Sequence, residues 1–338
     1  MTVAPLYARR ARSEDEDAPL RRESQRRDPV RGDASALSLV VMPVTQVDLP
    51  DRRRIDVWVE GPADGIPLVF HHGTPGAGLP FAPMVRAIAD RGLRYVSTSR
   101  AGYGDSSRLR DRTVADVVKD TQAVLDHLAA DKAYVMGWSG GGPHALACAA
   151  LMSDRVLGTT VLAAVAPWDA EGLDFLDGMG QENIAEFGAC VAGPEAHQAS
   201  LDALWPVFRD VSADQIAIAF GDLVDEVDRG ALTGEFAAFV AASIHEGLRE
   251  SHAGWYDDDV AFIRPWGFDL AAIDRPVHIW QGAHDRMVPF AHGQWLATHI
   301  PTACVHLSQE HGHLSLAIDS FPRILDEMLS FEASTPRA

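Results

Sequence analysis

The sequence predicts an α/β protein, a doubly wound and mostly parallel sheet with a helical cap inserted into it. The first observation is that apolar runs typical of strands alternate with helix-like stretches over residues 37–166 and again over 267–338. Alternation with helices of about 10 to 15 residues is typical of βαβ units, in which helices cover both faces of a parallel sheet. The second observation is that the alternation stops over residues 167–266, where apolar residues recur at helical spacing. The sequence therefore predicts two core segments separated by one insertion.

The first core segment opens with a hairpin and continues with alternating strands and helices. Short apolar runs bounded by turn residues favour strands at 41–47, 55–59, 67–70, 94–98, 133–137 and 157–164. The stretches between them favour helices at 81–91, 113–130 and 140–152. Thr113 is a suitable N-cap for the second of these helices, because a threonine hydroxyl can satisfy a free backbone N–H there.

The insertion, residues 167–266, is rich in alanine, leucine and acidic residues. Its helical pattern is interrupted at Gly193, Gly221 and Gly230, where we expect helices to end. A helical block inserted after one strand of such a sheet lies above the carboxyl edge of the strands, where ligands bind. The sequence thus predicts that the insertion forms a cap over a binding site.

The second core segment resumes the alternation after the insertion. It contains apolar runs that favour strands at 277–280 and 304–307. A helix is expected after Pro289, and a single closing helix from about Leu314 to Ser330.

Residues 1–36 form a separate compositional region. They mix acidic and basic side chains densely and have almost no apolar periodicity, which is typical of disorder. We expect a solvated tail that carries little of the function.

Composition narrows the classes of function. The chain has 338 residues, 47% of them hydrophobic, which suffices for a sizeable core. Its net charge of −19, from 29 basic and 48 acidic residues, argues against a nucleic-acid partner. No apolar run approaches the roughly 18 residues of a membrane span, and no signal peptide is evident. Three widely spaced cysteines suit a reducing compartment and neither a disulfide framework nor a zinc site, so we expect a cytoplasmic protein.

The segment 137–143, Gly-Trp-Ser-Gly-Gly-Gly-Pro, lies between an expected strand and an expected helix. This strand–turn–helix pattern is typical of a nucleophile elbow, in which the serine is strained and only glycine fits two residues before and after it. Gly137 and Gly141 occupy those positions, and Ser139 is the nucleophile candidate. At the helix start, the N–H of Gly140 can stabilise an oxyanion. The alternatives are a glycine-rich turn with an incidental serine, or a phosphate-binding loop, although the lysine of such a loop is absent.

A second loop carries a family resemblance. The segment 71–76, His-His-Gly-Thr-Pro-Gly, resembles the His-Gly-x-Pro loop of the α/β-hydrolase superfamily, as in proline iminopeptidases, epoxide hydrolases and many esterases. The resemblance implies that the backbone N–H after Gly73, which belongs to Thr74, forms half of the oxyanion hole beside Gly140. It also implies a cis bond between Thr74 and Pro75.

The remaining catalytic groups follow from chain order, since in this fold a serine is followed by an acid and then by a histidine. The turn at 282–289 resembles the Gly-x-x-Asp-x-x-Val-Pro turn that carries the family's acid, which selects Asp285. Gly312-His313 is similar to the family's Gly-His before the final helix, which selects His313 over His311. Asp169, after an earlier strand, is a rival to Asp285, because some relatives carry the acid there.

The segment 99–107, Ser-Arg-Ala-Gly-Tyr-Gly-Asp-Ser-Ser, also matches a family loop. Its expected role is structural, with Arg100 reaching a carboxylate of the insertion or a neighbouring loop.

These residues predict a serine esterase that forms an acyl-enzyme on a small-molecule acyl substrate, with no metal or cofactor. Serine at the elbow argues against epoxide hydrolases and dehalogenases, which use an aspartate there. Candidate pocket residues in the insertion are Trp205, Phe208, Phe236, Phe239, Trp255 and Tyr256, although aromatics at this spacing are more often core.

Two other functions stay open. One is an aminopeptidase of the proline iminopeptidase kind, in which acidic cap residues hold a substrate ammonium; Glu171, Glu182 and Glu186 are available. The other is a non-catalytic ligand-binding protein, because fold does not dictate function. Such proteins usually lose a triad member, and here all three candidates are present.

Overall fold

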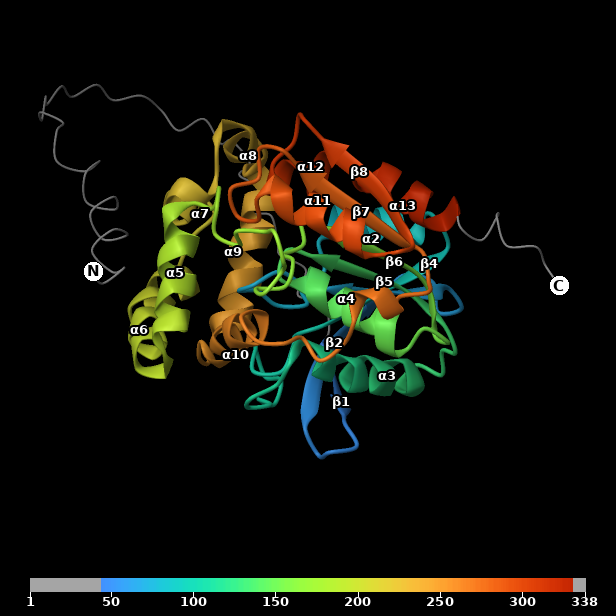
Figure 1. Ribbon diagram of the computed structural model, residues 1–338. Helices are drawn as coiled ribbons and strands as arrows, with labels where there is room; N and C mark the ends of the chain where they lie inside the picture. Colours follow the sequence, from blue (N-terminus) through green and yellow to red (C-terminus); the bar gives the residue numbers. More distant parts are fainter. Residues whose placement is uncertain (1–43, 331–338) are drawn as a thin grey trace, which may run out of the picture.

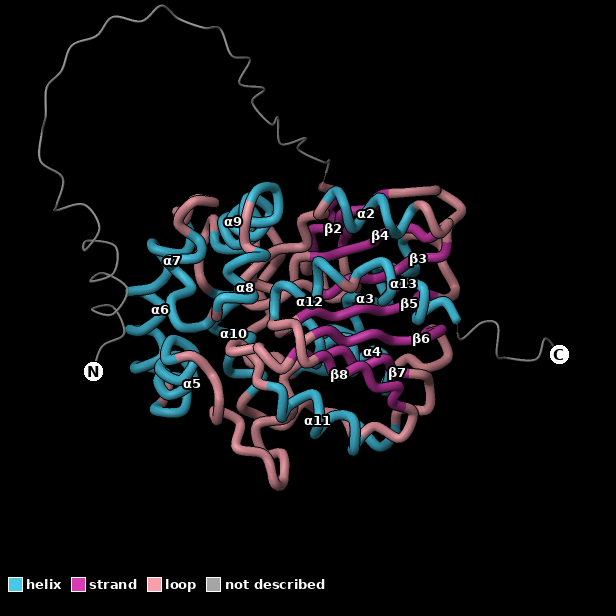
Figure 2. The backbone as a smooth tube through the Cα atoms, turned by 90° about the horizontal axis from the view of Figure 1, so that it is seen from above, coloured by secondary structure: helices cyan, strands magenta, loops and turns pink. Residues whose placement is uncertain are grey.

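The computed structural model describes residues 44–330, so the expected tail 1–36 lies outside the described residues. An eight-stranded sheet runs through the molecule in the order β1-β2-β4-β3-β5-β6-β7-β8 (Figures 1 and 2). Its strands are β1 (Thr45–Asp48), β2 (Arg54–Glu60), β3 (Ile66–His71), β4 (Leu93–Thr98), β5 (Ala133–Trp138), β6 (Val156–Leu162), β7 (Val277–Gly282) and β8 (Ala303–Ser308). Every strand expected within the described residues is therefore present, with its bounds shifted by a few residues.

The sheet is mostly parallel, as expected. β1 pairs with β2 and β2 with β4 in antiparallel fashion, which is the expected opening hairpin. All other neighbouring pairs, from β4 to β8, are parallel. Parallel strands need crossover connections, and helices supply them here. The fold is that of an α/β hydrolase, with helices on both sides of the sheet.

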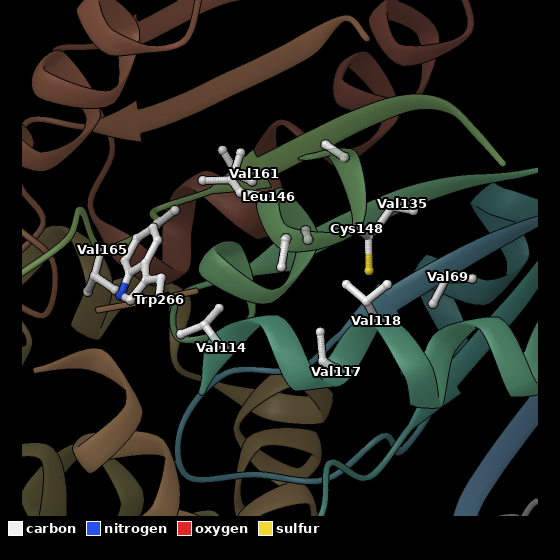
Figure 3. Close-up of a cluster of buried hydrophobic side chains, with 14 of the residues drawn as sticks. Val69, Val114, Val117, Val118, Val135, Leu146, Cys148, Val161, Val165 and Trp266 are labelled. Atoms are coloured by element: carbon white, nitrogen blue, oxygen red, sulfur yellow. The ribbon is translucent and has the colours of Figure 1, made fainter. Parts of the chain in front are cut away.

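Side chains alternate between the two faces of the central strands, because successive residues of a strand point to opposite sides. Val69, Val135 and Val161 face α3 (Val117–His127), α4 (Gly141–Leu151) and α11 (Phe290–His299), in a cluster that Figure 3 shows. The residues between them face the opposite layer. That layer contains α2 (Ala82–Ala89), α12 (His313–Asp319) and α13 (Phe321–Leu329).

Six α-helices lie between β6 and β7 and form a separate group beyond the ends of the strands (Figures 1 and 2). They are α5 (Gln181–Ala192), α6 (Pro194–Arg209), α7 (Ile216–Phe220), α8 (Glu226–Ala231), α9 (Gly234–Leu248) and α10 (Ala253–Phe262), called the cap helices below. The expected break at Gly230 is wrong, since Gly230 lies inside α8. The expected breaks at Gly193 and Gly221 are correct.

Two other expectations on helices need correction. The closing helix is not continuous: α12 ends at Asp319 and α13 restarts at Phe321, because Pro322 has no N–H to donate and its ring clashes with a preceding carbonyl. The helix after Thr113 begins with a 3₁₀ turn, η1 (Val114–Asp116). There the Asp116 carboxylate accepts hydrogen bonds from the N–H and hydroxyl of Thr113, at 2.9 and 3.0 Å.

The cap helices share a hydrophobic core with the sheet. One buried cluster contains Phe70 and Leu162 of the sheet together with Leu201 and Phe236 of the cap helices. Within residues 44–330, none of the helices has the length and apolar character needed to cross a membrane.

Candidate active site

Ser139 lies at a sharp turn between β5 and α4. Its backbone φ is +56°, a left-handed conformation that side-chain-bearing residues rarely adopt and that stores strain. The turn is held by two backbone hydrogen bonds, from Ser139 N–H to the Leu162 carbonyl and from Gly142 N–H to the Ser139 carbonyl, each 2.8 Å. A Cβ at Gly137 would overlap the backbone of Gly141, which explains the glycine spacing read from the sequence.

The oxyanion loop predicted from the sequence follows β3 and lies against this turn. A Cβ placed on Gly73 would be 3.4 Å from the Cβ of Ser139, so the loop passes directly beside the serine. A Cβ on Gly140 would overlap the Thr74 side chain, so the two expected oxyanion donors are neighbours. The Thr74–Pro75 bond is cis, as the sequence predicts.

His313 is paired with Asp285. Its Nδ1 lies 2.9 Å from Asp285 Oδ2, and both side chains are buried. Three donors fix the carboxylate: the N–H groups of Met287 and Val288, at 2.9 and 2.7 Å, and the Gln281 amide at 2.9 Å. The hydrogen bond to Asp285 places the Nδ1 proton toward the carboxylate and leaves Nε2 free to accept one. 

The two candidate acids, Asp169 and Asp285, differ in their surroundings. Asp169 is exposed on the loop after β6, whereas Asp285 is in contact with the imidazole.

Trp138, the residue before Ser139, stacks on the His313 ring with centroids 5.8 Å apart. Its indole N–H donates to the His313 carbonyl at 3.3 Å. The sequence contained no signal for this role of Trp138.

The electrostatic environment favours the protonated imidazole of His313. Burial lowers the pKa of His313, but the charge and hydrogen bond of Asp285 raise it, and the charge of Asp228 raises it further. The net effect is a pKa above the ordinary value of 6.5. This ring is therefore a stronger base than a free histidine.

One pocket joins these groups. Five of the six predicted site residues line it: Gly73, Thr74, Ser139, Gly140 and His313. Asp285 lies behind His313. The rest of the wall is mainly apolar, and of the six aromatic candidates in the insertion it includes Phe208, Phe239 and Trp255 but not Trp205, Phe236 or Tyr256.

Two acidic residues stand out in this apolar wall, Glu186 of α5 and Asp259 of α10. Glu186 accepts a hydrogen bond from the Trp255 indole at 2.7 Å, and Asp259 lies 2.8 Å from His197 Nε2. Burial, followed by the charge of Asp259, raises the pKa of Glu186 well above its usual range. Burial, followed by the charge of Asp258, does the same to the pKa of Asp259. Each carboxyl group is therefore more easily protonated than an exposed one.

A buried ion cluster, which the sequence indicated only through Arg100, supports the oxyanion loop. Arg100 donates to the His72 carbonyl, to the Gly73 carbonyl at 3.2 Å and to Thr74 Oγ1 at 2.9 Å. Its counter-ion is Asp258 of α10, at 2.6 Å. Arg100 thus reaches a carboxylate of the insertion, as the sequence predicts.

Asp258 accepts hydrogen bonds from side chains in several parts of the core. It accepts hydrogen bonds from Arg112 at 2.6 Å, from Tyr103 at 2.8 Å and from Thr74 Oγ1 at 2.6 Å. Burial raises the pKa of Asp258, but the charges of Arg100 and Arg112 outweigh it and hold the pKa well below the usual range. The cap helices are therefore tied to the oxyanion loop through an ionised carboxylate.

The tautomer of His72 is fixed by its neighbours. The backbone N–H of Arg100 donates to His72 Nε2 at 3.1 Å, so the proton lies on Nδ1, which donates to the Gly73 carbonyl at 2.7 Å. Because that carbonyl belongs to the same peptide group as the Thr74 N–H, two donors polarise the peptide from behind.

As for metals, residues 44–330 contain no group of three or more His, Cys, Asp or Glu side chains placed to hold one.

A family model described as the alpha/beta hydrolase fold matches residues 66–203. The chain is 31% identical over 148 residues to epoxide hydrolase B of Mycobacterium tuberculosis, a match that covers 42% of this chain and only 41% of that protein. It is 28% identical over 283 residues to a non-heme chloroperoxidase of Streptomyces lividans, which covers 81% of this chain and 94% of the relative.

Among solved structures, an alpha/beta hydrolase fold protein from Nakamurella multipartita superposes with a TM-score of 0.61 at 23% identity. The superposition covers 87% of this chain and all of that one.

Proposed function

Because this chain has the α/β-hydrolase fold, and because its relatives support a hydrolase, we propose that it is a serine hydrolase that cleaves a small carboxylic ester or related acyl substrate. The observation that carries the proposal is the convergence of Ser139, His313 and two backbone donors on one cavity, with Asp285 behind the imidazole. Nucleophile, base, orienting acid and oxyanion donors are the parts that acyl transfer needs.

In the proposed mechanism, Ser139 Oγ attacks the substrate carbonyl while His313 Nε2 takes its proton. Asp285 stabilises the imidazolium that forms. The N–H groups of Thr74 and Gly140 bind the oxyanion of the tetrahedral intermediate, and the positive end of α4 adds to its stabilisation. His313 then protonates the leaving alcohol, and in a second cycle it activates water to release the acid and regenerate Ser139.

The mainly apolar wall supports an acyl or aryl group as the part of the substrate that the cavity holds. Phe208, Phe239 and Trp255 contribute large apolar surfaces on the side of the cap helices. Burying such a group against them gives about 25 cal/mol per Å² of apolar surface removed from water.

The test is hydrolysis of nitrophenyl esters of increasing acyl length by the wild type and by Ser139→Ala. We expect ester turnover by the wild type and a loss of about 10⁴-fold or more in the variant. A fluorophosphonate should label Ser139 covalently in the wild type. Undiminished turnover by Ser139→Ala, or no labelling of Ser139, would reject the proposal.

A second candidate function, hydrolysis of an aminoacyl substrate with a free amino group, is favoured by one observation. Glu186 and Asp259 line the cavity as an acidic pair, whereas Glu171 and Glu182 do not. A substrate ammonium beside the pair would favour ionised carboxylates and form an ion pair with them.

Aminoacyl arylamides, with and without N-acetylation, distinguish the two candidates. If the aminoacyl function is correct, N-acetylation should abolish turnover, and Glu186→Gln should reduce it while Glu171→Gln, a change at an exposed position, should not. A preference for simple acyl esters that Glu186→Gln leaves intact would favour the esterase.

A further inference from the structure

We propose that Asp228, a buried residue of the cap helices, is a positioning residue that holds the backbone of His313 and stabilises its protonated ring by negative charge. The role of His313 as base rests on the proposed function, but the position and charge of Asp228 do not. The inference makes the cap helices a part of the catalytic machinery as well as a pocket wall.

The Asp228 carboxylate caps the helix that begins at His313. Its Oδ2 accepts a hydrogen bond from the His313 N–H at 2.7 Å. Its Oδ1 accepts from the N–H of Leu314 at 3.0 Å and of Ser315 at 2.9 Å. These are the first three residues of α12, whose N–H groups have no partner inside the helix. A residue distant in sequence thus does the work that an N-cap side chain usually does.

Two neighbouring residues adapt the turn to this carboxylate. The Ser315 hydroxyl donates to Asp228 Oδ1 at 2.9 Å and accepts from the Gly312 N–H at 2.8 Å. A Cβ on Gly312 would lie 2.5 Å from the Asp228 carboxylate, closer than real side chains approach. Glycine before His313 is therefore required by the aspartate.

The negative charge of Asp228 offsets the partial positive charge at the N-terminus of α12. The N-terminus of a helix carries partial positive charge, which disfavours a protonated imidazole at its first residue. Asp228 engages those N–H groups and places a full negative charge beside them. Its four donors are three backbone N–H groups and one hydroxyl, so none of them neutralises that charge.

Other groups near α12 also affect the surroundings of His313, and the test must distinguish their effects on its pKa from the effect of Asp228. Asp285 is the carboxylate in direct contact with the imidazole, and Trp138 is the uncharged neighbour on β5. Of the other charged groups on the elements around α12, His311 pairs with Asp319, Arg323 with Glu327, Asp326 with Arg91, and His284 with Asp225. On α8 itself, Arg229 donates to the carbonyls of Gly221 and Val224, and Glu226 is exposed. Glu186 and Asp259 lie in the cavity wall on the cap helices.

The test is an NMR titration of the histidine ring signals, which needs no substrate. The His313 signal is assigned by its loss in His313→Gln, and its pKa is compared between the full-length wild type and Asp228→Asn. The amide removes the charge and keeps one of the two accepting oxygens, so one backbone hydrogen bond is lost as well, and we expect the pKa of His313 to fall by about one unit. Asp228→Thr, also neutral and able to accept, replaces it if the asparagine variant does not fold.

Two control variants separate charge from geometry. Ser315→Ala removes two hydrogen bonds of the turn but keeps the Asp228 charge, so the pKa of His313 should change little. Asp225→Asn removes a more exposed carboxylate of the same segment, at the start of α8, and should also leave it unchanged.

The outcomes are distinct. A folded neutral variant with an unchanged pKa for His313 overturns the inference, as does a shift of equal size in Ser315→Ala. A shift confined to the Asp228 variants supports it. Should fluorophosphonate fail to label Ser139 while this shift is observed, the proposed hydrolase function fails and the effect of Asp228 on His313 stands.

Discussion

The backbone of Ser139 has a φ of +56°, and this single strained residue is accommodated by its surroundings in a specific way. Glycines flank it where a side chain would collide, and the oxyanion loop lies against it. The sequence predicted this arrangement, because glycine is required at positions where a Cβ atom would overlap neighbouring atoms. It could not predict Asp228 or Asp258, because an aspartate in an acidic helical segment resembles a solvated surface residue. Only their burial in the folded chain distinguishes them.

The assignment of Asp285 as the proposed catalytic acid is tested by two matched substitutions. Asp285→Asn should lower kcat by about 10⁴-fold, because the imidazole loses the carboxylate that fixes its tautomer and stabilises its charge. Asp169→Asn, at an exposed position, should have little effect. The measurement is steady-state hydrolysis of a nitrophenyl ester, and a severe loss in Asp169→Asn alone would contradict the assignment.

The pH dependence of activity follows from the environment of His313. In the proposed mechanism the imidazole must be neutral to take the serine proton, so kcat/KM should fall as the pH drops through its pKa. The carboxylates around it raise that pKa above 6.5, so the half-maximal point of the acid limb should lie above pH 6.5. A profile measured from pH 5 to pH 9 with its half-maximal point below 6.5 would refute this.

Secondary-structure elements were predictable where their signals are local. The strands and the core helices carry clear apolar periodicity, and all of those expected within residues 44–330 are present. The break at Ser320 was missed because a proline near the start of a helix is tolerated, so Pro322 did not signal a new helix. α10 was unremarkable in sequence, yet it carries Asp257, Asp258 and Asp259, which differ entirely in their partners.

The helix α10 offers a comparison between adjacent carboxylates. Asp258→Asn leaves Arg100 and Arg112 buried without a counter-ion, and we expect a loss of about 3 to 5 kcal/mol in the free energy of unfolding. Asp257→Asn breaks a pair with Arg108, whose side chain is 29% exposed, and should cost about 1 kcal/mol or less. Urea unfolding of both variants measures the difference, and equal losses would contradict the role of Asp258.

At the scale of the whole molecule, the cap helices and the sheet share one hydrophobic core. A single hydrophobic cluster runs from Phe70 of the sheet to Phe208 and Phe236 of the cap helices. Asp228 and Asp258 add buried polar contacts across the same boundary. The sequence predicted that the insertion would cover the carboxyl edge of the sheet, but the extent of this shared core depends on tertiary packing that periodicity does not encode.

We therefore expect the cap helices and the sheet to unfold together. Hydrogen exchange followed by mass spectrometry should give α9 and β5 similar protection, because both would open only in the global transition. Exchange of α9 that is faster than that of β5 by orders of magnitude would instead indicate a cap that opens independently.

The two aspartates that reach from the cap helices into the core also constrain how this protein could be re-engineered. A chimera that grafts the helices of a relative between β6 and β7 would import a new pocket, but it would discard the anchors of both the oxyanion loop and the His313 turn. Such a graft should retain the fold of the sheet and lose turnover unless both carboxylates are restored. Under the proposed function, substrate range and turnover therefore depend on the same helices, and exchanging those helices requires that both carboxylates be restored.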